Sequence, residues 1–394
     1  MKSSKPQFVG KKVKLGELCE ICSGGTPKRS VAEYWKDGTI PWMKIGDMSE
    51  KYVSSTEERI TDAGFNNSSV KMLEPGTLLY SIFASIGAVS ILKIPASTNQ
   101  AIAGLKIKDD SLDRDFLYHY LKSRESISKS SGRGAAQNNI NLTILRNMQV
   151  TLPSIEIQRS IVRNLEMISN QVTIAESHLM DLDALVKSRF VEIFGDFACY
   201  ETKPLIKCVD CIEAGKSPKC LAFSRKMAEP GVLKLSAISS GVYCENENKA
   251  LPRSVSLTID KVVHANDILL SRKNTPELVG RSVLVKHTDG NIMFPDIIFR
   301  MHPLPPINAM YLSYLLAGPL LHSIQSLAHG SAKSMSNIPK SELAKLSIPI
   351  PALNLQNEFA NFVSQVDKSR FVAQQQIEKL QMLYDSLAQE YFGD

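Results

Sequence analysis

The sequence has no long apolar run, and no apolar segment follows its charged N-terminal residues 1–6. The longest apolar stretch, residues 78–92, has 15 residues and is interrupted by three serines, whereas a membrane span needs about 20 apolar residues. We therefore expect neither a signal peptide nor a membrane anchor. Seven cysteines in a chain without a secretion signal indicate free thiols in a reducing cytoplasm.

The motifs that would indicate an enzyme are also missing. Residues 215–217, Gly-Lys-Ser, resemble the end of a phosphate-binding loop, but the position that requires the first glycine is Asp210. No dinucleotide-binding glycine motif and no Asn/Asp-Pro-Pro-aromatic methyltransferase motif is present, and no Glu-x-Lys follows Pro295-Asp296 as in a nuclease. The seven histidines show no metal-ligand spacing. These absences predict a binding protein with no catalytic residue, metal or cofactor of its own.

What the sequence does contain is an internal duplication. Phe194-Gly195-Asp196 recurs as Phe392-Gly393-Asp394, at an offset of 198. The same offset relates Gly132 to Gly330, Asn139-Ile140 to Asn337-Ile338, Leu145 to Leu343, Pro153 to Pro351, Gln158 to Gln356 and Leu182 to Leu380. Farther upstream an offset of 190 relates Leu15 to Leu205, Gly25 to Gly215, Lys44 to Lys234 and Ser81 to Ser271. The chain is therefore two diverged copies of one unit of just under 200 residues.

The duplication also bears on two cysteine pairs whose spacing suggests zinc. Cys19-x-x-Cys22 and Cys208-x-x-Cys211 do not align with each other. At the offset of 190, the partners of Cys19, Cys22, Cys208 and Cys211 are Val209, Ile212, Leu18 and Ile21. Each cysteine thus replaces an aliphatic residue of the other copy, which favours a small buried hydrophobe over a metal ligand.

The back part of each copy reads as a long helix. Apolar residues recur at alternating spacings of four and three, the pattern of a coiled coil. In copy one they are Ile161, Leu165, Ile168, Val172, Ala175, Leu179, Leu182, Val186 and Ile193, with Arg189 as an exception; in copy two they are Phe359, Val363, Val366, Ala373, Ile377, Leu380, Tyr384, Leu387 and Tyr391, with Arg370 as an exception. Each helix would run for about 38 residues, or roughly 57 Å. Since neither stripe can be buried by a lone helix, we expect the two helices to pack on each other as an antiparallel pair.

The front parts read as short strands and turns with one helix each. Residues 39–45 and 73–82 are strand-like, and a helix is expected at 113–126. Copy two repeats this order, with a helix near 310–316. The predicted fold class is therefore α+β.

Charge is distributed unevenly along the chain. Residues 154–196 contain seven acidic and four basic side chains, and residues 352–394 contain six and three. Each helical region thus carries −3, and the rest of the chain must carry +12 to give the total of +6. A basic surplus confined to the front parts suits contact with nucleic-acid phosphates, although an ordinary solvated surface would account for it too.

Several segments together identify a family. The front of copy one holds Leu15-Gly16-Glu17, Ser23-Gly24-Gly25-Thr26-Pro27, and Ile40-Pro41-Trp42 leading to Asp47; then follow Asn138-Asn139-Ile140, Leu152-Pro153 with Gln158, and the helices ending in Phe-Gly-Asp. In combination these segments resemble the specificity (S) subunit of type I restriction-modification enzymes, over nearly the whole chain. Copy two departs at the first motif, where it has Ala214-Gly215-Lys216-Ser217-Pro218, and it lacks the Pro-Trp pair.

The resemblance implies a fold of two tandem α/β target-recognition domains separated by two long antiparallel coiled-coil helices with a pseudo-twofold internal repeat. The domains would be residues 1–152 and 197–350, and the helices residues 153–196 and 351–394. It also implies that the subunit reads a bipartite site on double-stranded DNA, while the helices set the spacer between the half-sites. The partners it implies are two modification subunits, which methylate adenine with S-adenosylmethionine, and two restriction subunits, which cleave DNA with ATP and Mg²⁺.

Candidate DNA-binding residues are basic or amide side chains near turns of the front parts. In the first domain they are Lys28, Arg29, Lys44, Arg133 and Asn138, and in the second Lys216, Lys219, Lys234, Arg272, Lys273, Arg281 and Lys333. Asn138 and its neighbour Asn139 would either bond adenine edges or form a turn, and Trp42 is expected in the core. The acidic faces of the helices and the junctions near 152–153 and 350–351 are the candidate docking surface for the modification subunits. The alternative to DNA recognition is a coiled-coil scaffold whose domains bind protein.

Overall fold

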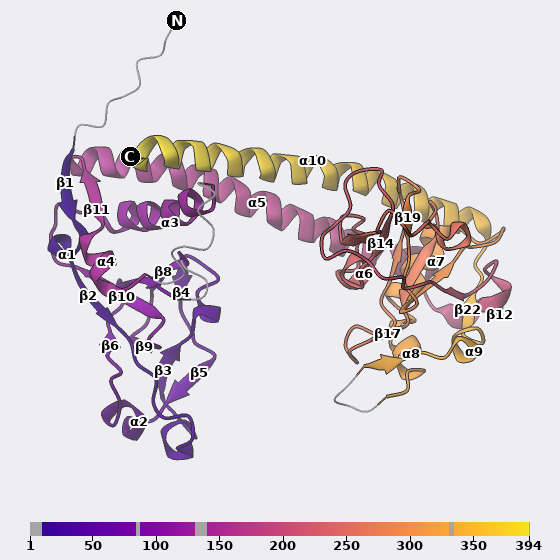
Figure 1. Cartoon of the computed structure of the whole chain (residues 1–394), viewed down its shortest axis with the longest axis horizontal. Helices are drawn as coiled ribbons and strands as arrows, with labels where there is room; N and C mark the ends of the chain where they lie inside the picture. The colour runs from indigo at the N-terminus through magenta and orange to yellow at the C-terminus, as the bar shows by residue number, and fades with distance from the viewer. Residues whose placement is uncertain (1–9, 84–86, 131–139, 331–334, 394) are drawn as a thin grey trace, which may run out of the picture. The chain divides into compact units, whose positions relative to one another are not determined.

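The computed structural model describes residues 10–83, 87–130, 140–330 and 335–393. The chain divides into two compact units. Unit 1 comprises residues 1–178 and 373–394, and unit 2 comprises residues 179–372. Each unit therefore contains one part of each long helix, together with its own sheets and core (Figure 1).

Unit 1 is built from short strands and helices ahead of the first long helix. Its strands are β1 (Lys11–Lys14), β2 (Cys19–Ser23), β3 (Ile40–Met43), β4 (Tyr52–Val53), β5 (Glu58–Ile60), β6 (Met72–Leu73), β7 (Leu78–Ser81), β8 (Val89–Leu92), β9 (Ala96–Thr98), β10 (Ile102–Ile107) and β11 (Gln149–Leu152), and its shorter helices are α1 (Leu15–Leu18), α2 (Asp62–Asn66), α3 (Arg114–Ser130) and α4 (Leu142–Asn147). One sheet has the order β2-β10-β7-β8-β4 and another the order β5-β3-β9-β6, while β1 pairs with β11. Most pairs are antiparallel, but β3 and β9 run parallel, as do β4 and β8. The helix expected at 113–126 is present as α3.

Unit 2 has a similar set of elements. Its strands are β12 (Thr202–Pro204), β13 (Glu213–Ala214), β14 (Gly231–Leu233), β15 (Asn248–Ala250), β16 (Ile268–Ser271), β17 (Lys273–Asn274), β18 (Ser282–Leu284), β19 (Ile292–Met293), β20 (Ile298–Met301), β21 (Ser336–Asn337) and β22 (Ser347–Pro349), and its shorter helices are α6 (Ser236–Ser239), α7 (Ala309–Ala317), α8 (Leu321–Ser326) and α9 (Lys340–Leu343). The sheets have the orders β13-β20-β16-β18 and β15-β14-β19, and β12 pairs with β22. Strands β14 and β19 run parallel. The helix expected near 310–316 is α7.

The strand order of unit 1 recurs in unit 2. The series β2-β10-β7-β8 corresponds to β13-β20-β16-β18, the parallel pair β3/β9 to β14/β19, and the pair β1/β11 to β12/β22. A backbone hydrogen bond ahead of the first strand of each series also recurs. Leu15 N donates to Met148 O in unit 1, and Leu205 N donates to Leu346 O in unit 2, both at 2.8 Å. The duplication in the sequence is thus a duplication of topology.

The structure corrects the alignment of the copies at one point. In unit 1 the register of β2 against β10 is constant from Cys19↔Ile107 to Ser23↔Ala103. In unit 2 the bridge Val209↔Pro303 is followed by Ala214↔Phe299, so the first strand has one extra residue between them. An extra residue on one strand is a bulge. Downstream of it the offset is 191, and Gly215 corresponds to Gly24 rather than to Gly25.

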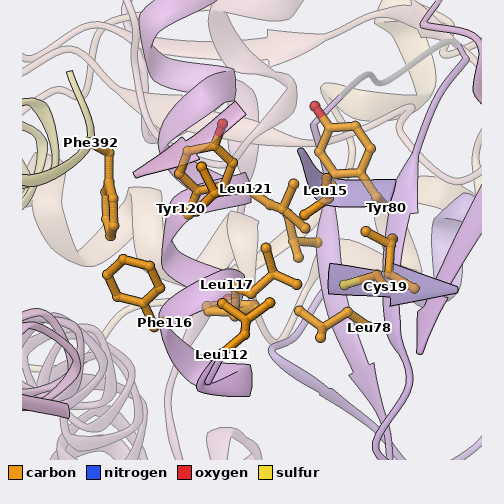
Figure 2. Close-up of a cluster of buried hydrophobic side chains, with 14 of the residues drawn as sticks. Leu15, Cys19, Leu78, Tyr80, Leu112, Phe116, Leu117, Tyr120, Leu121 and Phe392 are labelled. Carbon is orange, nitrogen blue, oxygen red and sulfur yellow. The ribbon is translucent and has the colours of Figure 1, made fainter. Parts of the chain in front are cut away.

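The core of unit 1 joins α3 to the sheet and to the end of the second long helix, α10 (Leu353–Phe392) (Figure 2). Phe116 and Tyr120 of α3 meet the ring of Phe392 edge-on, at centroid distances of 5.3 and 5.8 Å. Leu78 and Cys19 lie on the other side of α3 and are buried. Because burying one large apolar side chain contributes about 1.5–3 kcal/mol, this cluster ties α10 firmly to the sheet.

The core of unit 2 uses aromatic residues in the same way. Phe190 and Phe194 come from the first long helix, α5 (Ile155–Phe194), Phe359 comes from α10, and Tyr311 comes from α7. The ring centroids of Phe194 and Tyr311 are 4.7 Å apart, and those of Phe190 and Phe359 are 5.0 Å apart. Aromatic pairs at these separations add about 0.5–1.5 kcal/mol beyond their buried area.

The two predicted long helices are present, and each has 40 residues. They begin after Pro153 and Pro351, where a proline can start a helix, and α5 ends before Gly195, whose φ of 54° favours glycine. All residues of the two apolar stripes are buried or half-buried. Within the described residues, none of the helices combines the length and apolar character needed to cross a membrane.

The two arginines that interrupt the stripes make ion pairs between the helices of unit 2. Arg189 of α5 pairs with Glu358 of α10 at 2.6 Å, and Arg370 of α10 pairs with Asp183 of α5 at 2.5 Å. The numbers rise along one helix as they fall along the other, so the helices are antiparallel in this unit. Arginine at these positions therefore extends the contact between the helices instead of breaking it.

Candidate nucleic-acid interface

Two of the candidate cations of unit 1 belong to one network of ion pairs. Glu58 of β5 pairs with Arg29 at 2.5 Å and with Lys44 at 2.7 Å, and Lys44 also pairs with Glu57 at 2.8 Å. Hydrogen bonds from Arg29 and Lys44 lower the pKa of the Glu58 carboxyl, Arg29 having the larger effect. Hydrogen bonds to Glu57 and Glu58 raise the pKa of Lys44. The network joins two basic and two acidic side chains, so its formal net charge is zero.

Arg29 also contacts the rings of two tryptophans. Its guanidinium lies 3.8 Å from the ring centroid of Trp35 and 4.8 Å from that of Trp42. Trp42, expected in the core, is 2% exposed, and its Nε1 donates to Gly25 O at 2.9 Å. A planar guanidinium stacks on aromatic faces better than an ammonium does, so Arg29 is held in place as part of the structure of unit 1.

The lysine at the matching position of unit 2 also has a glutamate partner. Lys234 lies 3.5 Å from Glu247, and both residues stand 190 positions after Lys44 and Glu57. The pair is therefore repeated in both units. A lysine that already neutralises a carboxylate gains less from a DNA phosphate than a free one, because the two acceptors compete for the same ammonium.

Three candidates of unit 2 lie around Asp296. The backbone N–H groups of Arg272 and Lys273 both donate to Ile297 O, and Arg272 Nη1 donates to Asp296 O at 3.3 Å. The hydroxyl of Ser217, next to Lys216, hydrogen-bonds the carboxylate of Asp296. Lys273 also pairs with Asn337 across β17 and β21. Lys216 and the adjacent pair Arg272-Lys273 are far apart in sequence but thus lie at the same end of the sheet β13-β20-β16-β18.

The remaining candidates differ in how strongly they are held. Arg281 is half-buried and donates from Nη1 to Ser239 O at 3.0 Å. Lys28 and Lys219 are exposed, and among the described residues neither has an ion-pair partner within 4.0 Å. Arg133, Asn138 and Lys333, like Asn139, lie outside the described residues.

The four cysteines of the two possible zinc pairs are all at least partly removed from solvent. Cys19 and Cys208 are buried, and Cys22 and Cys211 are half-buried. Burial raises the pKa of the Cys19 thiol to about 12, which leaves it protonated and a poor metal ligand. Within residues 10–83, 87–130, 140–330 and 335–393, no three His, Cys, Asp or Glu side chains are grouped as a metal site would require.

Sequence reasoning missed the acidic partners of the candidate cations. Glu57, Glu58 and Glu247 decide which lysines are neutralised, and Trp35 supplies the face on which Arg29 stacks. A signal was available for one pair, because a glutamate follows the repeated lysine by 13 positions in both copies. No signal of that kind exists for Trp35, whose counterpart in copy two is not aromatic.

Residues 10–181 match the family model described as "Type I restriction modification DNA specificity domain". Among curated proteins, the chain is 27% identical over 199 residues to the type I restriction enzyme MjaIX specificity subunit of Methanocaldococcus jannaschii, covering 49% of this chain and 45% of that protein. It is 28% identical to the EcoR124I/EcoR124II specificity subunit of Escherichia coli, covering 39% of each. The aligned segment thus spans less than half of either relative. The MjaVIII specificity subunit of M. jannaschii is 23% identical, covering 90% of this chain and 85% of the relative.

Two solved structures share the fold. One is a chain from the "Structural basis underlying complex assembly and conformational transition of the type I R-M system", with a TM-score of 0.58, 16% identity and coverage of 99% of both chains. The other is the type I restriction-modification system S subunit from M. genitalium, with a TM-score of 0.50, 14% identity and coverage of 100% of this chain and 98% of that one.

Proposed function

From the membership of this chain in the family of type I restriction enzyme specificity subunits, we propose that each of its two units reads one half of a bipartite site on double-stranded DNA. The observation that carries the proposal is a shared topology with different side chains at one place. Ile140 N donates to Ile82 O in unit 1, and Ile338 N donates to Arg272 O in unit 2. The residues that directly follow β7 in unit 1 are therefore Ile82-Phe83, and those that follow the equivalent β16 in unit 2 are Arg272-Lys273. Equivalent surfaces with different donors and acceptors suit two different base sequences.

In this proposal residues 1–152 and 197–350 are the target-recognition domains, and residues 153–196 and 351–394 form the coiled coil between them. The apolar stripes of 3.5-residue period and the ion pairs of Arg189 and Arg370 support helix pairing over a long contact. A helix of 40 residues is about 60 Å long, which suits a rod that sets the spacer between the half-sites. The DNA-binding candidates are those predicted from the sequence except Arg29, which its ion pair with Glu58 and its stacking on Trp35 engage within unit 1.

The chain itself would be non-catalytic and would act in the cytoplasm. Two modification subunits would bring S-adenosylmethionine, and two restriction subunits would bring ATP and Mg²⁺. The helices offer a docking surface for the modification subunits that is not only acidic. Met167, Met180 and Val191 of α5 and Phe371 and Met382 of α10 are each more than 60% exposed, and exposed apolar side chains on a regular helix favour contact with another protein.

The proposal is tested by titrating duplex DNA with the full chain at several salt concentrations. Each phosphate that is neutralised releases counterions, so the logarithm of the affinity should fall linearly with the logarithm of the salt concentration, with a slope of about −0.9 per contact. A coiled-coil scaffold that binds only protein would show no binding to duplex DNA at low salt, and that outcome would reject the proposal. Mapping of methylated adenines in cells that carry the gene would then identify the target.

The role of the helices has a test of its own. Insertion of one heptad into α5 and a matching heptad into α10 adds about 10 Å while keeping both stripes in register. The recognised spacer should lengthen by about three base pairs, since the axial rise of DNA is about 3.4 Å per pair. A variant that folds, binds DNA and keeps the original spacer would show that the length of the helices does not set the spacer.

A further inference from the structure

A loop at the end of the first strand of the sheet is built in the same way in both units. In unit 1, Gly24 N donates to Ile102 O at 3.3 Å, and Gly25 N donates to Thr98 O at 2.9 Å. In unit 2, Gly215 N donates to Ile298 O at 3.3 Å, and Lys216 N donates to Phe294 O at 3.0 Å. The equivalent hydrogen bonds align Gly24 with Gly215 and Gly25 with Lys216, at an offset of 191.

At this offset the two loops have the same pattern of residues, which the offset of 190 concealed. Gly24-Gly25-Thr26-Pro27-Lys28 corresponds to Gly215-Lys216-Ser217-Pro218-Lys219. Both segments therefore read glycine, any residue, a hydroxyl residue, proline, lysine. We call them the hook of unit 1 (residues 24–28) and the hook of unit 2 (residues 215–219).

The glycine that starts each hook lies against backbone. A Cβ on Gly24 would lie 2.0 Å from Thr98 O, and a Cβ on Gly215 would lie 1.9 Å from Phe294 O. No side chain fits at those distances, so glycine is required for the close approach. Both hooks are thus in close contact with the backbone opposite them, at the end of β9 in unit 1 and at the residue after β19 in unit 2.

The hydroxyl residue holds the second part of each hook. Thr26 Oγ1 hydrogen-bonds Gln100 Oε1, and Ser217 Oγ hydrogen-bonds Asp296 Oδ1. Gln100 and Asp296 are themselves equivalent, at the offset of 196 that also relates Thr98 to Phe294. The proline that follows fixes φ near −65° and restricts the residue before it. The proline therefore restricts the direction of the chain at the lysine, which is the last residue of each hook.

The lysines at the tips differ from the other repeated lysines in their partners. Lys28 and Lys219 are exposed, and in the part of the chain that the structure describes neither pairs with a carboxylate. Lys44 and Lys234, in contrast, are paired with Glu57 and Glu247. Among the described residues, no carboxylate therefore competes with an outside anion for the ammonium of either hook lysine.

The surroundings of the hooks have diverged. Arg29, the residue after the first hook, stacks on Trp35, and its counterpart after the second hook is Cys220. Ile82-Phe83 in unit 1 stands where unit 2 has Arg272-Lys273. Two units that read different bases have one chemical feature of the target in common, which is the phosphate backbone. An exposed cation that both units keep, on a loop that both build alike, suits that shared feature.

We propose that Lys28 and Lys219 are equivalent DNA-backbone contacts, each set by its hook to neutralise one phosphate beside the half-site that its unit reads. The inference rests on the proposed DNA recognition and assigns these two lysines a role in affinity and register, not in base choice. The side chains that choose bases are then to be sought among the positions that differ between the units.

The test compares Lys28→Ala, Lys219→Ala and the double variant of the full chain with the wild type. Each single variant should weaken binding to a duplex containing the selected site by about three- to tenfold at moderate salt and reduce the salt slope by about one. The double variant should reduce the slope by about two, and Lys→Arg at either site should restore most of the affinity. Lys12→Ala and Lys203→Ala are matched controls, because both lysines are exposed on the small sheets β1-β11 and β12-β22.

A second readout separates backbone contact from base reading. Selection of bound sequences from a randomised duplex library should give the same preferred bases for the wild type and for each single variant. A changed preference in one half-site, or unchanged affinity and salt slope in both variants, overturns the inference while leaving the proposed function intact. Absence of salt-dependent DNA binding by the wild type overturns the proposed function itself. Unchanged thermal unfolding of the variants shows that any loss is not caused by misfolding.

Discussion

Gln158 and Gln356, 198 positions apart, make the same hydrogen bonds in their own units. Gln158 Oε1 accepts from Asp113 N and Gln356 Oε1 accepts from Asn308 N, both at 2.8 Å. Gln158 Nε2 donates to Pro153 O at 2.9 Å, and Gln356 Nε2 donates to Pro351 O at 2.8 Å. Each amide is fully buried and links the first turn of a long helix to the start of another helix. It therefore fixes the direction in which the long helix leaves its unit.

Replacement of either glutamine by leucine should destabilise its unit. The apolar side chain fills a similar volume but leaves a backbone N–H and at least one carbonyl unpaired, at about 1–3 kcal/mol for each unsatisfied group. Chemical denaturation followed by circular dichroism measures the loss, and Gln376→Leu, on an exposed position of α10, is the control. A cost no larger than that of the control would mean that water or a rearranged backbone satisfies these groups.

The hook glycines should not tolerate a methyl group. Gly24→Ala and Gly215→Ala must move backbone, and overpacking of this kind costs about 1–3 kcal/mol. Gly46→Ala is the matched control, since a Cβ on Gly46 would meet no atom within 4 Å, and it should change stability by no more than about 0.5 kcal/mol. Unit 1 can be followed separately by tryptophan fluorescence, because both tryptophans, Trp35 and Trp42, lie in it. Equal stability of Gly24→Ala and Gly46→Ala would contradict the close approach.

Arg29 should act on stability rather than on DNA affinity. Arg29→Ala removes the stacking on Trp35 and the ion pair with Glu58, and we expect a loss of about 1 kcal/mol in the free energy of unfolding, because the side chain is half exposed. The salt slope of DNA binding should stay at the wild-type value, in contrast to Lys28→Ala. Urea unfolding measures the stability of the Arg29→Ala and Lys28→Ala variants, and DNA titration at several salt concentrations measures their salt slopes. A slope reduced by about one in Arg29→Ala would show that the guanidinium leaves Glu58 for a phosphate.

His119 should make unit 1 sensitive to acid. It is 2% exposed and its Nδ1 lies 2.8 Å from Tyr384 Oη. Burial, followed by the positive charges of Lys51 and Lys122, lowers its pKa from 6.5 to about 3. The unfolded chain therefore binds a proton between these values that the folded chain does not. The contribution of His119 to the free energy of unfolding is therefore fully present above pH 6.5. It is lost as the pH falls toward 3, at up to about 1.4 kcal/mol per pH unit.

The measurement is the free energy of unfolding of unit 1 between pH 4.5 and 7, followed by tryptophan fluorescence. His119→Asn cannot take up this proton and should show a shallower loss below pH 6.5 than the wild type. His178→Asn, on an exposed position of α5, should keep the wild-type pH dependence. Identical curves for His119→Asn and the wild type would show that the carboxylates alone cause the acid sensitivity.

The sequence by itself determined the large-scale plan of this protein. Repetition at a fixed offset is visible without a structure, and so are the 3.5-residue stripes and the prolines and glycines that bound the helices, because each is a property of neighbouring residues along the chain. The same is true of the motifs that resemble those of specificity subunits. The burial of Cys19 was predicted from its aliphatic partner in the other copy, and Trp42, which was expected in the core, is also buried.

Only the tertiary structure decided which candidate cations are free. Glu58 reaches Arg29 and Lys44 through space, and nothing in the spacing of these residues along the chain requires that contact. The bulge between Val209 and Ala214 was also hidden, because the identity of Gly25 with Gly215 made the wrong offset look correct. Hydrogen bonds between strands, not residue identity, fix the register, and they align the two hooks that end in Lys28 and Lys219.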